Sequence, residues 1–123
     1  MRIEQFRYGT DNLAYLVFSG SWGVAVDPGA PDDMVAFARR QHITIRQVTN
    51  THLHPDHTCG NDRILEKTRA EFLDCRNLGN KDTIALGEEA LTVITTPGHT
   101  HDDVCFSGGD FLVTGDTLFN GTV

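Results

Sequence analysis

One segment of eleven residues constrains this chain more than any other. Residues 51–61 read THLHPDHTCGN, so three of the six histidines lie with Asp56 inside six residues. The segment follows ITIRQVT (residues 43–49), whose alternating apolar residues predict a β-strand. Loops that follow strands build many of the sites in α/β folds. The histidines therefore predict a metal site at a strand end; the competing interpretation is a solvated polar loop.

The spacing inside this segment favours two binding points. Residues two apart in an extended chain point the same way, so His52 and His54 can reach one ion. Pro55 keeps His54 extended, because the residue before a proline avoids the helical region. Beyond Pro55 the chain turns, so Asp56 and His57 are expected to face a second point. Two-metal hydrolases hold their ions about 3.5–4 Å apart, a separation that one loop can serve.

Zinc usually takes about four ligands, so the loop alone does not complete a site. Two later segments have similar features. TTPGHTHDD (residues 95–103) places His99 after a predicted strand, and VTGDTLF (residues 113–119) places Asp116 after the flexible Gly115. We predict one ion held by His52, His54 and His99, a second held by Asp56 and His57, and Asp116 as the bridge between them. Asp27, in VAVDPG, is either a turn residue or a partner of a ligating histidine.

The rest of the chain has a mixed pattern. Apolar or alternating runs predict strands, acid-to-base polarity with apolar residues one turn apart predicts helices, and a Gly-Gly-Asp turn predicts a hairpin. The expected strands are residues 3–8, 13–18, 24–27, 43–49, 70–75, 91–96, 103–108 and 111–116. The expected helices run from Pro31 to near Arg40 and over residues 60–69. This is an α/β (α+β) arrangement in which the two helices leave one sheet face uncovered.

Composition narrows the function. At 123 residues the chain fits one domain, and its net charge of −7 argues against a nucleic-acid partner. Three cysteines at wide spacings indicate no disulfide framework, which favours a reducing, cytoplasmic setting. The start, MRIEQFRYGT, is not a signal peptide, and no apolar run reaches membrane-spanning length, so no membrane association is expected.

THLHPDH resembles the T-H-x-H-x-D-H signature of the metallo-β-lactamase superfamily. TPGHT (residues 96–100) and TGDTLF (residues 114–119) are similar to the segments that supply its next histidine and its bridging aspartate. The resemblance implies the αββα sandwich of that superfamily, with only its first half present, so that residues 1–123 form a C-terminally incomplete domain. The residues of these segments are most similar to those of the glyoxalase II group.

That group implies a metal-dependent hydrolase acting on a glutathione thioester. Two divalent ions, zinc in the first place but also iron or manganese, would generate a hydroxide that attacks the thioester carbonyl. Asp56 would orient this hydroxide and is therefore the expected catalytic residue. The small-molecule thioester is the expected partner.

Two alternatives remain open from the sequence. Persulfide dioxygenases resemble glyoxalase II in the same segments and hold one iron through the equivalents of His52, His99 and Asp116. The second alternative is a protein without activity, whose uncovered sheet face pairs with a second copy or another chain.

Overall fold

The computed structural model of this protein describes residues 1–95, 103–114 and 118–120. None of the helices in these described ranges has the length and apolar character that crossing a membrane requires. The elements in chain order are β1 (Arg2–Tyr8), β2 (Asn12–Ser19), β3 (Trp22–Val26), α1 (Pro31–Arg40), β4 (Thr44–Thr49), α2 (Pro55–Thr58), α3 (Asn61–Lys67), β5 (Glu71–Phe72), a 3-10 helix (Cys75–Asn77), β6 (Thr83–Leu86), β7 (Glu89–Thr95), β8 (Val104–Gly108), β9 (Phe111–Val113) and β10 (Leu118–Asn120).

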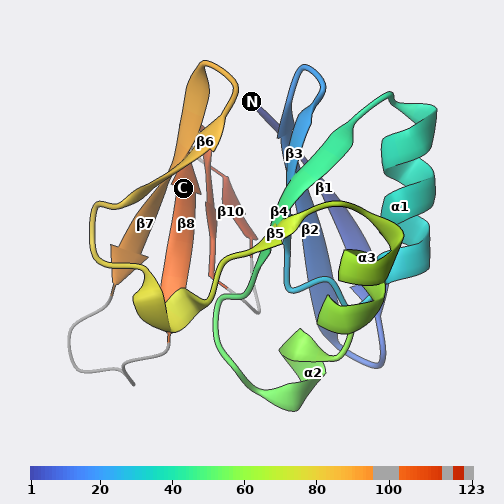
Figure 1. Cartoon of the computed structure of the whole chain (residues 1–123). Helices are drawn as coiled ribbons and strands as arrows, with labels where there is room; N and C mark the ends of the chain where they lie inside the picture. The colour runs from blue at the N-terminus through green and yellow to red at the C-terminus, as the bar shows by residue number, and fades with distance from the viewer. Residues whose placement is uncertain (96–102, 115–117, 121–123) are drawn as a thin grey trace.

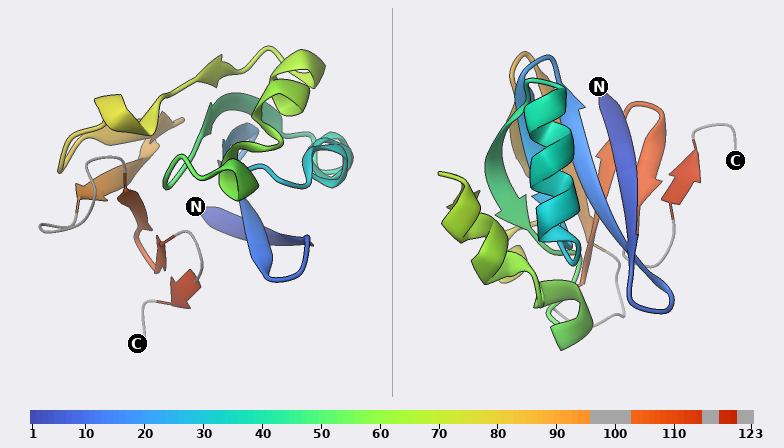
Figure 2. Two further views of the ribbon diagram at one scale, coloured as in Figure 1. Left: turned by 90° about the horizontal axis from the view of Figure 1, so that it is seen from below. Right: turned by 90° about the vertical axis from the view of Figure 1, so that its right-hand side faces the viewer.

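The strands form two five-stranded sheets that pack face to face. The first has the order β1-β2-β3-β4-β5 and the second the order β10-β9-β8-β7-β6. Helices α1 and α3 cover the outer face of the first sheet, and no helix in the described part of the chain lies over the outer face of the second (Figures 1 and 2). The described residues thus supply one helix layer and both sheets, which confirms the expected α/β fold class.

Strand β2 is apolar on both faces because it lies between two cores. Tyr15 and Val17 belong to the core between the sheets, whereas Leu16 and Phe18 belong to the core under the helices. A strand that is buried on both sides carries a continuous apolar run in place of alternation. This explains the LAYLVF sequence.

Helix α1 connects two parallel strands, β3 and β4. Pro31 begins the helix, at a position where the backbone N–H would have no partner within the helix. Acidic residues lie in the first turn and basic residues in the last, where the helix dipole favours each charge. Its buried residues Met34, Val35 and Ala38 pack in the core under the helices. This crossover directs the end of β4, and hence the histidine segment, to the same sheet end as β3.

Three strands of the first sheet finish at that end. Both β1 and β3 pair antiparallel with β2, and β3 and β4 are parallel, so β1, β3 and β4 share one direction. Tyr8 ends β1, Asp27 follows β3, and Asn50 follows β4. Residues far apart in the sequence therefore meet beside the histidines.

The structure also differs from the sequence-based expectations. The strand expected over residues 70–75 is only the two-residue β5, because the Asp74 side chain accepts a hydrogen bond from the backbone N–H of Arg76 and turns the chain into the 3-10 helix. Strand β6, strand β10 and helix α2 were not expected. Each has three or four residues, which is too short for a clear apolar period.

Strand β7 offers a direct test of the sheet packing. Leu91 is fully buried between the sheets, whereas Ile94 on the same strand is 38% exposed. We expect Leu91→Ala to lower the free energy of unfolding by about 2–5 kcal/mol, because the truncation leaves a cavity. Ile94→Ala should change it by less than about 0.5 kcal/mol. Urea unfolding of both variants measures this, and equal losses would contradict the packing.

Candidate metal centre

The histidine loop, residues 50–58, begins directly after β4 and ends with α2. Its three imidazoles gather: the ring centroids of His52 and His54 lie 4.6 Å apart, and those of His52 and His57 lie 3.9 Å apart. His57 is only 2% exposed, whereas His54 lies on the surface and His52 is half-buried. The structure thus brings together the three histidines that the sequence singled out, with their rings in contact.

Pro55 has the local effect that the sequence predicted. His54 is extended, with φ −64° and ψ 142°, and α2 begins at Pro55. The helical turn re-aims Asp56 and His57, so that Asp56 Oδ2 lies 3.6 Å from His57 Nε2. Asp56 remains largely open to solvent, with 53% of its side chain exposed. A carboxylate and an imidazole nitrogen therefore face each other at the mouth of the loop.

His99 and Asp116 lie outside the described residues, so their predicted roles as ligand and bridge stay predictions. Within the ranges that are described, no three His, Cys, Asp or Glu side chains form a group that could hold a metal ion. Strand β8 does reach the histidine loop, because Val104 donates its backbone N–H to the carbonyl of Thr51 at 2.7 Å.

Asp27 is the buried anchor of the loop. It has a left-handed backbone, with φ 50°, and it has no exposed surface. Its carboxylate accepts three hydrogen bonds: from the Thr51 backbone N–H at 2.9 Å, from the Thr51 hydroxyl at 2.7 Å and from His57 Nδ1 at 3.1 Å. Asp27 thus turns the chain and also orients His57; that this histidine binds a metal stays a prediction.

These contacts define which imidazole nitrogens can bind a metal. A carboxylate only accepts, so His57 Nδ1 carries a hydrogen, and in the neutral ring Nε2 keeps the lone pair. The Thr51 hydroxyl gives its hydrogen to Asp27, so it accepts from His52 Nδ1, 2.9 Å away. His52 then also has its lone pair on Nε2. Metal-binding histidines are commonly oriented in this way by a partner on the other ring nitrogen.

Burial keeps His52 in the form that binds metals. Desolvation by burial, followed by the electrostatic effect of the neighbouring His57, lowers the pKa of His52 below its ordinary value of 6.5. A neutral imidazole is the form that ligates a metal, so less proton competition accompanies binding near neutral pH. Imidazole and carboxylate donors at this loop fit zinc, iron or manganese.

Sequence reasoning missed several residues that shape the site. Thr51 links His52 to Asp27, a role for which its place as the first residue of the T-H-x-H-x-D-H signature gave no reason. Buried Asn50 donates its side-chain amide to the carbonyl of His57 at 2.9 Å and exchanges hydrogen bonds with Asn61. Tyr8 donates to the carbonyl of Asp56 at 2.6 Å across 48 residues of sequence, a separation that leaves no local signal.

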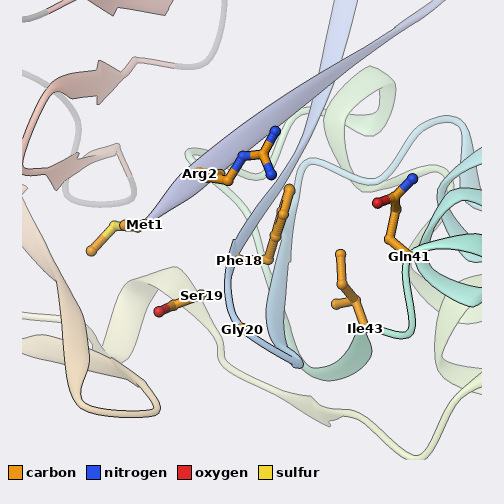
Figure 3. Close-up of a pocket in the computed structure, with 7 residues that line it drawn as sticks. All are labelled: Met1, Arg2, Phe18, Ser19, Gly20, Gln41 and Ile43. Carbon is orange, nitrogen blue, oxygen red and sulfur yellow. The ribbon is translucent and has the colours of Figure 1, made fainter.

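A separate cavity of about 220 Å³ lies at the opposite end of the first sheet (Figure 3). The guanidinium carbon of Arg2 lies 5.7 Å from the centroid of the Phe18 ring on one side of it, and Gln41 faces it from the other. None of the described residues that line it is a histidine, cysteine, aspartate or glutamate. This cavity is not part of the candidate metal centre.

Comparisons with known proteins agree with the fold and the loop. The Metallo-beta-lactamase superfamily pattern matches residues 7–72 and 75–123. A hydroxyacylglutathione hydrolase from Anaeromyxobacter dehalogenans is 36% identical over 97% of this chain and 51% of its own length. Another, from Rhodospirillum rubrum, is 34% identical over 96% of this chain and 52% of its own length. The chain thus spans about half the length of these curated relatives.

Solved structures show the same fold. ETHE1 from Myxococcus xanthus superimposes with a TM-score of 0.80 at 24% identity, covering 91% of this chain and 56% of its own. The BLEG-1 B3 metallo-beta-lactamase gives a TM-score of 0.71 at 19% identity, covering 85% of this chain and 66% of its own. At these identities the likeness concerns the fold alone.

The Asp27 network predicts a change of tautomer in Asp27→Asn. All three groups that bond Asp27 are donors, so an amide NH₂ in its place must face one of them. We expect His57 to move its hydrogen from Nδ1 to Nε2, and the free energy of unfolding to fall by about 1–3 kcal/mol. Imidazole ¹⁵N NMR and urea unfolding measure the two effects.

The matched control is Asp32→Asn. Asp32 pairs with Arg63 and Lys67 on the surface, and its side chain is 61% exposed. Loss of this exposed ion pair should change the free energy of unfolding far less than Asp27→Asn does and leave the His57 tautomer unchanged. An unchanged tautomer in Asp27→Asn would contradict the network.

Proposed function

Because this chain belongs to the metallo-β-lactamase superfamily, we propose that it supplies the metal-binding half of a thioester hydrolase of the glyoxalase II kind. Members of the superfamily bind divalent metals, typically zinc. The relatives named above are hydroxyacylglutathione hydrolases, which makes a hydroxyacyl thioester of glutathione the proposed substrate.

One observation in the chain itself carries the proposal. The rings of His52 and His57 lie 3.9 Å apart, and each has its Nδ1 engaged by a protein acceptor. Two neighbouring imidazoles that are oriented through Nδ1 and present Nε2 are suited to a metal centre. The surface position of His54 and Asp56 beside them leaves room for a substrate.

The proposed ligands divide as the sequence suggested. His52, His54 and His99 would hold one ion, and Asp56 and His57 the second, with Asp116 shared between them. A bound divalent ion of this kind lowers the pKa of a water toward neutrality and polarises a carbonyl oxygen. His99 and Asp116 enter here from the sequence alone.

The chain's own residues then have separate tasks. The Asp27 carboxylate keeps the hydrogen of His57 on Nδ1, so that Nε2 stays available for binding. The Asp56 carboxylate, exposed and 3.6 Å from His57 Nε2, would orient the attacking water and accept its proton. The thiolate that leaves a thioester is a weak base, so the site needs no strong general acid.

Asp56→Asn tests the catalytic assignment. We expect the zinc-loaded chain to hydrolyse a hydroxyacyl thioester of glutathione. The variant should lose about a hundredfold or more in kcat, because the amide neither accepts a proton nor binds the second ion well. Loss of the thioester absorbance measures the rate, and elemental analysis measures the bound metal. Asp62→Asn, an exposed aspartate in the first turn of α3, is the matched control and should retain full activity.

The same variant separates the hydrolase from an iron dioxygenase. A single-iron site built from the equivalents of His52, His99 and Asp116 does not use Asp56. The proposal would be overturned if Asp56→Asn still consumed oxygen with glutathione persulfide, and if the chain bound iron and hydrolysed no thioester. A chain that holds no divalent metal and turns over neither substrate would overturn it as well.

A further inference from the structure

We propose that Tyr8 is a positioning residue of the candidate metal centre, which holds α2 in place by donating its hydroxyl to the carbonyl of Asp56. The two atoms are 2.6 Å apart, although the residues are 48 apart in sequence. The inference rests on the proposed function, because it concerns how Asp56 and His57 are presented to a metal ion. It assigns a task to a side chain outside the histidine loop.

Helix α2 needs support from outside because it has only four residues, Pro55–Thr58. The last four carbonyls of any helix lack partners within the helix, so every carbonyl of α2 falls in this group. A single turn is also far below the length at which helices are stable alone. No side chain of α2 caps its N-terminus. The order of α2 therefore depends on contacts that other segments make with it.

Two side chains from neighbouring strand ends supply such contacts. Tyr8, at the end of β1, donates to the Asp56 carbonyl, and Asn50, just after β4, donates to the carbonyl of His57 at 2.9 Å. Consecutive carbonyls are thus held from two strands of the sheet. Asp56 and His57 are the two proposed ligands of the second ion. The two hydrogen bonds therefore fix the backbone positions from which both side chains extend.

The ring of Tyr8 packs against Gly29, which has no side chain to obstruct it. A Cβ atom on Gly29 would lie only 2.1 Å from two carbons of that ring, so the phenol fits against the turn after Asp27 only because residue 29 is glycine. A Cβ on Gly60 would likewise lie 1.8 Å from the carbonyl oxygen of Pro28. The turn that carries Asp27 is therefore packed between Tyr8 on one side and the start of α3 on the other.

The hydroxyl and the ring of Tyr8 can be tested separately. Tyr8→Phe keeps the ring against Gly29 and removes the hydroxyl, and Tyr8→Leu removes both. Amide hydrogen exchange in the metal-free chain reports the opening of α2 through the N–H groups of His57 and Thr58, which both bond to the carbonyl of His54. We expect Tyr8→Phe to raise these two exchange rates about 2- to 12-fold, the value of one net hydrogen bond, with β2 and β7 unchanged.

Thr68→Val is the matched control. Thr68 is also half-buried, and its hydroxyl also donates to a helix carbonyl, that of Ile64 at 2.8 Å in α3. Its loss should leave the exchange of His57 and Thr58 unchanged. If Thr68→Val raises these rates as much as Tyr8→Phe does, the proposal is wrong. It is also wrong if Tyr8→Phe exchanges at the wild-type rates while Tyr8→Leu exchanges faster.

Zinc affinity links the local effect to the site. The dissociation constant for zinc, measured by competition with a coloured chelator, should rise in Tyr8→Phe by up to the factor seen in exchange, because only the closed form of α2 presents both ligands. Thr68→Val should bind zinc as the wild type does. Faster exchange with unchanged affinity would overturn the positioning role. A wild-type chain that binds no zinc would contradict the proposed function instead, and the exchange result would still decide whether the Tyr8 hydroxyl holds α2.

Discussion

Asp27 sits at the end of β3 with its carboxylate fully buried, and the histidine loop is organised around it. An unpaired carboxylate costs several kcal/mol to bury, so its three donors are needed for the fold as much as for the site. Two of these donors belong to Thr51 and one to His57. The same bonds that offset the cost of burial also leave Nε2 of both His52 and His57 with a lone pair. The stability of the fold and the proposed metal chemistry thus depend on one group.

The layered architecture brings that group to its partners. Parallel β3 and β4, joined through α1, end side by side, and β1 finishes at the same edge. Cores on both faces of the first sheet fix these strand ends. The second sheet contributes through Val104, whose N–H bonds to the carbonyl of Thr51. Residues from four separate segments therefore surround the histidine loop. None of these surrounding residues is itself a proposed metal ligand.

The sequence predicted the parts of the molecule that have a local pattern. The apolar run of β2, the proline and charge polarity of α1, and the effect of Pro55 on His54 all depend on neighbours in the chain. The clustering of His52, His54 and His57 followed from their spacing. By contrast, α2 and β6 have too few residues for a period, and the bond from Tyr8 to Asp56 spans 48 residues. Such contacts depend on strand order and on the space that Gly29 leaves, which no short window of sequence contains.

Zinc titration of the chain, followed by ¹⁵N NMR of its histidine rings, tests the central claim most directly. If Asp27 and Thr51 prepare the loop for metal, the Nε2 resonances of His52 and His57 shift on zinc binding while both Nδ1 atoms keep their hydrogens. Binding through Nδ1 of either ring, or no change at Nε2 in saturating zinc, would contradict it.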